Sequence, residues 1–181
     1  NYISKKSEIF LLFRPKADNK IIKQIIKKDF DFILAFGSGT INDLAKHSSF
    51  IKQTPYSIIA SAPSMNGYNS ANASIIEKNN KKSLKSHLPI KSFFDLKFLA
   101  KSPKRLIKSG VGDSLCALTC DFDWLLANFF YSKKYDLAIS QLLKKNFDNL
   151  CRCSYEDPRF MKILCQNLIS SGFAMTIFGS S

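Results

Sequence analysis

Apolar and polar residues alternate in blocks along the first hundred residues, and the blocks predict strands and helices in turn. Two largely apolar runs, over Phe32–Phe36 and Tyr56–Ala60, predict buried strands. A helical pattern from Thr40 to Ile51 lies between them, directly after Gly37–Gly39. Isoleucines at helical spacing predict an earlier helix over Asn19–Lys28. This order of elements is typical of a doubly wound parallel sheet.

Shorter apolar runs predict the remaining strands. Ser7–Phe13 reads as a short first strand that ends at Arg14. Ala73–Ile76 and Ser83–His87 predict a β-hairpin around a polar turn at Glu77–Lys81. Pro89–Leu96 predicts a last strand, because no strand pattern follows it.

The pattern becomes helical after residue 100. Pro103–Gly110 predicts a short helix with proline at its start and glycine at its end, followed by a break at Val111–Asp113. Three longer helices are predicted over Ser114–Tyr131, Lys134–Asp148 and Asp157–Phe178. We therefore expect an α/β fold, a partial doubly wound parallel sheet that is Rossmann-like, followed by an all-helical domain. The expected domains are residues 1–100, incomplete at the N-terminus, and 101–181, incomplete at the C-terminus.

Composition excludes several classes of protein. Hydrophobic residues make up 45% of the 181 residues, which indicates a folded protein, and no apolar run reaches the roughly 18 residues of a membrane span. The net charge of +13 is spread over scattered lysine doublets, so we expect no nucleic-acid partner. Five cysteines form no CxxC pair and have no neighbouring histidine, which argues against a zinc site or a disulfide framework. We expect a cytoplasmic protein.

The glycine turn Gly37–Gly39 is the first candidate for chemistry. It joins a buried strand to a helix N-terminus, where unpaired N–H groups and the helix dipole favour a phosphate. The turn lacks the third glycine of the common dinucleotide fingerprint, so a plain connection remains an alternative. Asp43, in the first turn of that helix, is explained equally by helix capping.

Two further polar segments follow. Ser61–Ser70 succeeds the second buried strand and is crowded with small polar residues, as a ligand wall or a surface loop would be. Asp113 lies at the predicted break between helices. It is either a metal-binding carboxylate or an acid at a helix N-terminus.

Taken in order, Gly37–Asp43, Ala62–Ser70 and Ser109–Asp113 resemble the motifs of the glycerol-1-phosphate dehydrogenase family. That family belongs to the superfamily of iron-containing alcohol dehydrogenases and dehydroquinate synthases. The likeness covers most of the chain and includes Pro103–Trp124, which is similar to the start of the family's helical domain.

The resemblance implies an oxidoreductase that moves a hydride between NAD(P)H and dihydroxyacetone phosphate, giving sn-glycerol 1-phosphate. It also implies a divalent metal (Zn, Ni or Fe), with Asp113 as a metal ligand that also contacts substrate. Asn66 stands where related bacterial enzymes have a substrate-contacting aspartate. The implied cofactor-binding residues are Gly37, Gly39, Thr40, Ile41, Asn42, Asp43, Ser61, Ala62, Pro63, Ser64 and Ser70.

The same resemblance implies two further metal ligands, both histidines of the helical domain. The only histidines here are His47, expected at the surface of its helix, and His87, at a strand end, and neither lies in a matching motif. We therefore expect a fragment shortened at both ends. It is either active, as a homo-oligomer or with a complementing C-terminal fragment, or a degenerate, non-catalytic remnant that at most binds a dinucleotide.

Overall fold

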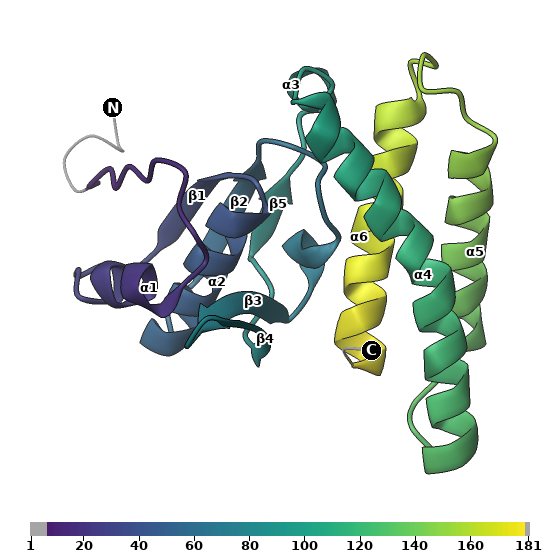
Figure 1. Cartoon of the computed structure of the whole chain (residues 1–181), viewed down its shortest axis with the longest axis horizontal. Helices are drawn as coiled ribbons and strands as arrows, with labels where there is room; N and C mark the ends of the chain where they lie inside the picture. Colours follow the sequence, from purple (N-terminus) through teal and green to yellow (C-terminus); the bar gives the residue numbers. More distant parts are fainter. Residues whose placement is uncertain (1–6, 180–181) are drawn as a thin grey trace.

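A small parallel sheet forms the centre of the first half of the chain. The computed structural model describes residues 7–179, and its sheet contains β1 (Ile33–Gly37), β2 (Tyr56–Ala60) and β5 (Lys91–Phe93) in the order β1-β2-β5 (Figure 1). Gly37 of β1 pairs with Ala60 of β2, so the carboxyl ends of these two strands lie side by side. The fold is therefore α/β, as expected, and its ligand-accepting edge contains the glycine turn.

Helices and a hairpin surround this sheet. The helix α1 (Asn19–Ile26) packs on α2 (Gly39–Lys52), and α2 packs on β1, β2 and β3. The hairpin of β3 (Asn72–Glu77) and β4 (Asn80–Lys85) confirms the predicted one. A single turn of 3₁₀ helix, η1 (Gly67–Asn69), interrupts the polar loop between β2 and β3.

The second half of the chain is helical. After the short α3 (Leu96–Leu99) come three long helices, α4 (Lys104–Tyr131), α5 (Leu137–Cys151) and α6 (Phe160–Phe178). Figure 1 shows them side by side, with α6 nearest the sheet. A cluster of buried residues runs without a gap from Ala35 and Ile58 of the sheet to Leu164 and Leu168 of α6. The α/β part and the helices thus share one core.

The predicted break at residues 111–113 is wrong, because α4 continues through it. Gly110 was read as a helix end. In the structure it lets the backbone of Pro63 approach α4 so closely that a Cβ atom would overlap the Pro63 carbonyl oxygen. The glycine serves packing and not termination, since a glycine inside a helix costs only about 1 kcal/mol. Asp113 is therefore a mid-helix residue, and the helix-capping alternative for it is wrong as well.

Other boundaries also differ from the predictions. Residues 7–13 form no strand, and Ile9, Leu11 and Phe13 are exposed, because no neighbouring strand offers them hydrogen bonds. The helix α5 begins at Leu137 because the Asp136 side chain accepts hydrogen bonds from two N–H groups of its first turn. Likewise α6 begins at residue 160, after the proline that was expected inside its first turn.

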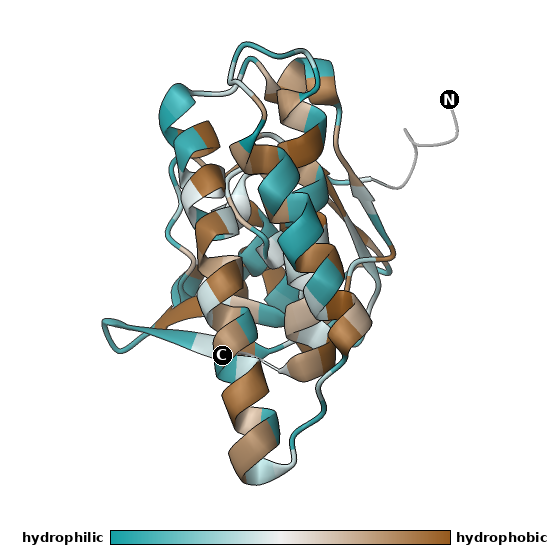
Figure 2. Ribbon diagram, turned by 90° about the vertical axis from the view of Figure 1, so that its right-hand side faces the viewer, coloured by the Kyte–Doolittle hydropathy of each residue, from teal (hydrophilic) through white to brown (hydrophobic). Residues whose placement is uncertain are grey.

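Two apolar surfaces remain open to solvent. On the face of the sheet away from α2, Leu34 and Phe36 are 58% and 60% exposed. On α4, Phe122, Leu125 and Phe129 are exposed at helical spacing, and Figure 2 shows hydrophobic residues along the end of that helix that projects beyond its neighbours. Within residues 7–179, no helix has both the length and the apolar character needed to cross a membrane.

Candidate functional site

The glycine turn lies where β1 gives way to α2. Ser38 is the N-cap residue of α2, and its side chain makes no capping hydrogen bond. The first N–H groups of a helix have no partners inside it, so those of α2 are left for a ligand or water. An anion is favoured there by the positive end of the helix dipole.

Both glycines of the turn are also required by packing. A Cβ atom on Gly37 would lie 2.5 Å from the side chain of Ile41, and one on Gly39 would lie 2.6 Å from the sulfur of Met65. The Met65 side chain therefore occupies the space above Gly39 that a larger residue would fill. Close packing by itself explains why both positions are glycine. A ligand bound at this turn would have to share the space with Met65.

The loop after β2 is held against the core by its own backbone. The Ala62 carbonyl accepts a hydrogen bond from the buried Tyr68 hydroxyl at 2.8 Å. The Ser64 carbonyl accepts one from the Ser109 hydroxyl of α4 at 3.1 Å, next to the close approach of Pro63 and Gly110. Residues 62–64 thus fix the path of the loop, and their side chains are buried.

Asp113 meets this loop directly. Its Oδ2 atom accepts a hydrogen bond of 2.6 Å from the backbone N–H of Asn66. Burial raises the pKa of Asp113, while the hydrogen bond from Asn66 and the charge of Lys81 on β4 act against that rise. The structure therefore brings the second and third sequence motifs together, since Asn66 and Asp113 are 47 residues apart in the chain.

The first motif joins the same cluster from α2. The Asn42 side chain donates to the Gly67 carbonyl at 3.3 Å, and the Asp43 carboxylate accepts from the Ser74 N–H at 3.3 Å. Desolvation by burial raises the pKa of Asp43 to about 6, although the nearby charge of Lys46 lowers it. Asn42 thus binds the polar loop and Asp43 binds β3, and the capping explanation of Asp43 does not describe its contacts.

Accessibility divides the thirteen candidate residues into two sets. Those with partly exposed surface, able to touch a ligand with their side chains or backbone, are Gly39, Thr40, Ile41, Ser61, Asn66 and Asp113. Those that are buried, and so able to act mainly by holding the others, are Gly37, Asn42, Asp43, Ala62, Pro63, Ser64 and Ser70.

The sequence analysis missed one residue of this site. Lys46 is fully buried and donates hydrogen bonds to carbonyls of the polar loop. The available signal was its position on the same helix face as Asn42 and Asp43, three and four residues away. His47, expected at the surface, is half-buried, and its Nδ1 atom lies 3.0 Å from the Ser86 hydroxyl.

The donor set does not fit a metal ion. Among residues 7–179, no group of three histidine, cysteine, aspartate or glutamate side chains is close enough to hold one. A catalytic zinc normally takes three protein ligands, and Asp113 alone supplies one carboxylate. His47 and His87 lie instead among Ser86, Ser49 and Tyr56.

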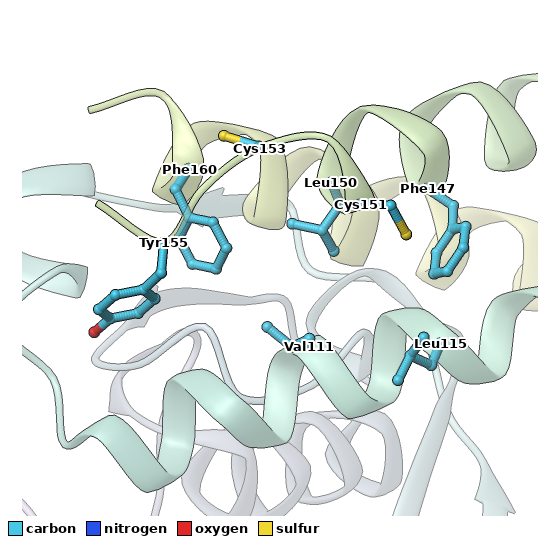
Figure 3. A pocket seen from close by; sticks show the side chains of 8 residues that line it. All are labelled: Val111, Leu115, Phe147, Leu150, Cys151, Cys153, Tyr155 and Phe160. Atoms are coloured by element: carbon cyan, nitrogen blue, oxygen red, sulfur yellow. The ribbon is translucent and has the colours of Figure 1, made fainter. Parts of the chain in front are cut away.

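Two hollows in the described part of the chain lie away from the glycine turn. One, of about 310 Å³, is bounded on α4 by Val111 and Leu115 (Figure 3). Figure 3 shows these two side chains pointing toward Leu150 and Phe160 across the hollow. Val111 and Asp113 are two residues apart, about 200° around the helix, so this hollow lies on the opposite face of α4 from the candidate site. The other, of about 650 Å³, borders His87 and residues 50–55.

Comparison with known proteins adds evidence of relationship. Residues 12–103 match the model of the family described as iron-containing alcohol dehydrogenase. A glycerol-1-phosphate dehydrogenase from Geobacillus thermodenitrificans is 31% identical over 173 residues, covering 91% of this chain and 43% of the relative. One from Thermococcus sibiricus is 34% identical over 173 residues, covering 92% of this chain and 49% of the relative. The chain thus spans about half the length of these curated relatives.

Solved structures agree on the fold. A probable glycerol dehydrogenase from Sinorhizobium meliloti superposes with a TM-score of 0.79 at 17% identity, over 93% of this chain and 53% of that one. Glycerol dehydrogenase from Schizosaccharomyces pombe gives a TM-score of 0.76 at 18% identity, over 94% of this chain and 48% of that one. The family model covers more than half of the chain, and we conclude that this protein belongs to the iron-containing alcohol dehydrogenase family.

Proposed function

We propose that this chain forms the dinucleotide-binding part and the start of the helical part of an NAD(P)-dependent oxidoreductase. The proposed reaction interconverts dihydroxyacetone phosphate and sn-glycerol 1-phosphate. The observation that carries the proposal is the meeting of three separate motifs at one edge of the sheet, where the Asn66 N–H binds the Asp113 carboxylate. The relatives named as glycerol-1-phosphate dehydrogenases support the choice of substrate.

In this proposal the pyrophosphate of the cofactor binds the free N–H groups of Gly39, Thr40 and Ile41. These residues are partly exposed, and the Ser38 hydroxyl does not cap the helix, so the positive end of α2 remains available to an anion. Ser61 follows β2 beside this turn and extends the surface toward the nicotinamide. The buried residues Asn42 and Ser70 hold the loop, Asp43 binds the Ser74 N–H of β3, and in this proposal none of the three touches the cofactor.

Asn66 and Asp113 face the substrate in this proposal. NAD(P)H supplies the hydride, and the chain orients the two reactants. The one carboxylate of Asp113 does not make a metal site, so any metal ion needs further ligands from residues outside the described chain. In this proposal, activity therefore requires a second segment that supplies these ligands.

The test combines binding and turnover. NADH fluorescence is titrated with the full chain alone. Oxidation of NADH is then followed with dihydroxyacetone phosphate and Zn²⁺ or Ni²⁺, with and without a polypeptide that carries the carboxyl-terminal half of a glycerol-1-phosphate dehydrogenase. We expect binding by the chain alone and turnover only in the combined sample. Asp113→Asn is the matched control, which should retain NADH binding and lose turnover. Absence of turnover in both mixtures would rule out the enzymatic proposal.

A second candidate function is favoured by a specific observation. Because the described residues hold no metal cluster and Met65 occupies the space above Gly39, the chain fits a non-catalytic family member that at most binds a dinucleotide. NADH binding without turnover in any mixture supports this candidate. One equivalent of tightly bound metal in the purified chain would contradict it.

A further inference from the structure

Lys46 of α2 is a lysine that is buried in the core. None of its side chain is exposed, although lysine is among the residues least often found fully buried. Burial lowers the pKa of Lys46 to about 8, and the charge of Asp43 acts against this. A buried ammonium group must find partners for its three N–H donors, since an unpartnered charge in the core is very costly.

The partners of Lys46 are three backbone carbonyls of one loop. Its Nζ atom donates to the carbonyl oxygens of Gly67, of Ser70 at 2.7 Å and of Asn72 at 3.0 Å. The Ser70 hydroxyl lies 3.5 Å away and itself hydrogen-bonds to the Gly67 and Asn72 carbonyls. The ammonium group thus lies among carbonyl oxygens of the loop and of the first residue of β3, as a bound cation would, and it joins Gly67, Ser70 and Asn72 through one donor atom.

This loop links the two sides of the candidate site. Asn66, which binds Asp113, directly precedes Gly67, and Met65, which covers Gly39, precedes Asn66. On the other side, α6 contacts the loop where a Cβ atom on Gly172 would overlap the Asn66 carbonyl. Any shift of Gly67 relative to α2 would therefore move Met65 and Asn66 together.

We propose that Lys46 is a positioning residue that fixes the segment from Met65 to Asn72 on α2, and so sets the separation between the glycine turn and Asp113. The expected effect of Lys46 on cofactor affinity rests on the proposed function. The expected effect of Lys46 on the position of the loop does not. Nothing in the hydrogen-bond pattern of β1 or α6 depends on Lys46, so its loss should be felt in the loop first.

Three variants separate this role from a general contribution to the core. Lys46→Met keeps the length of the side chain and removes its charge and donors. Lys46→Ala leaves a space that n-propylammonium matches in length and charge. Lys52→Met is the control, because Lys52 lies in the last turn of the same helix, over the ring of Phe30, and contacts none of the loop carbonyls.

The first measurement is hydrogen exchange of the full chain without ligand. For Lys46→Met we expect exchange at the amides of Asn69 and Ser70 to accelerate at least about tenfold, with β1 and α6 nearly unchanged. Added n-propylammonium should slow the same amides in Lys46→Ala, and Lys52→Met should match the unmodified chain. Uniform acceleration over the whole chain, or unchanged exchange in the loop, would overturn the proposal. Failure of both Lys46 variants to fold would overturn it too, because Lys46 would then be needed for the core as a whole.

The second measurement is NADH affinity in the same variants. We expect Lys46→Met to bind NADH at least about tenfold more weakly, and n-propylammonium to restore part of the affinity of Lys46→Ala. A loosened loop with unchanged NADH affinity would overturn the positioning role. If the unmodified chain binds no NADH, the proposed function fails, while the exchange result still decides whether Lys46 holds the loop.

Discussion

At the scale of single residues, two glycines of α4 differ in the space available to a side chain. Gly110 permits the closest backbone approach in the site, because a Cβ atom there would overlap the Pro63 carbonyl. Gly112, two residues later, has no atom within 4 Å of the position of a Cβ. The sequence presents both as helix breakers, and only the three-dimensional contact distinguishes them.

Alanine substitutions at these glycines should change stability in opposite directions. Gly110→Ala forces α4 away from the loop and should lower the free energy of unfolding by about 2 kcal/mol or more. Gly112→Ala adds a side chain in open space and should raise it by roughly 0.5 to 1 kcal/mol through the lower helix propensity of glycine. Urea unfolding of the two variants measures both effects. A similar gain in both variants would contradict the close contact between Gly110 and Pro63.

Asp43 should make stability depend on pH in the acid range. Its pKa rises from 3.8 to about 6 on folding, so the folded chain holds a proton more tightly than the unfolded chain. The tighter proton binding adds to the free energy of unfolding below about pH 4. This contribution is lost as the pH rises through about 6, a change of about 3 kcal/mol. Denaturant titrations between about pH 4 and pH 7 measure it, with Asp43→Asn as control. A slope that persists in Asp43→Asn would assign the effect to another group.

At the scale of elements, α2 differs from the helices capped by aspartate. Asp18, Asp95 and Asp136 each accept hydrogen bonds from the first-turn N–H groups of α1, α3 and α5. Ser38 makes no such bond on α2. A helix that leaves its first N–H groups uncapped loses about 1 kcal/mol of stability and keeps a place for an anion.

Ser38→Asp should therefore raise the stability of the chain and weaken NADH binding. The new carboxylate would cap α2 and interact with its dipole, which should raise the free energy of unfolding by about 1 kcal/mol. The same negative charge would repel a pyrophosphate, so NADH affinity should fall at least about tenfold. Ser38→Asn, which caps without charge, is the matched control. Thermal unfolding and NADH titration measure both effects, and unchanged affinity in Ser38→Asp would place the cofactor elsewhere.

Most elements could be predicted from local pattern, because the strands β1 and β2 and the helix α2 are strongly apolar or strongly periodic. The predictions fail where contacts between residues far apart in the chain determine the local structure. Residues 7–13 contain a short apolar run typical of a strand but pair with no strand of the described chain, and the glycine at 110 faces Pro63. In the same way, only the family resemblance predicts the roles of Asn66 and Asp113, and the helix-face position of Lys46 beside Asn42 and Asp43 does not by itself predict its burial.

At the scale of the whole molecule, the chain exposes apolar surface that parallel sheets normally cover. Leu34, Phe36 and Phe93 are exposed on one face of the sheet, and the ring of Phe36 lies 5.8 Å from that of the partly exposed Phe98, between centroids. The chain also covers about half the length of its curated relatives.

The open faces should make the isolated chain associate in a salt-dependent way. The net charge of +13 keeps copies apart at low ionic strength, and salt screens that repulsion while leaving apolar attraction intact. Sedimentation equilibrium should show more association at about 0.5 M salt than at about 0.05 M. Leu34→Lys combined with Phe36→Lys should reduce it with little loss of stability, since both side chains are exposed. A monomer under all conditions would contradict this prediction.

The central claim is that a dinucleotide binds the N-terminus of α2 across from Asp113. Hydrogen exchange of the full chain, with and without saturating NADH, tests it most directly. We predict slower exchange at residues 38–41 and 61–67, and little change around the hollow that borders His87. Protection confined to that hollow, or no protection anywhere at saturating NADH, would contradict the claim.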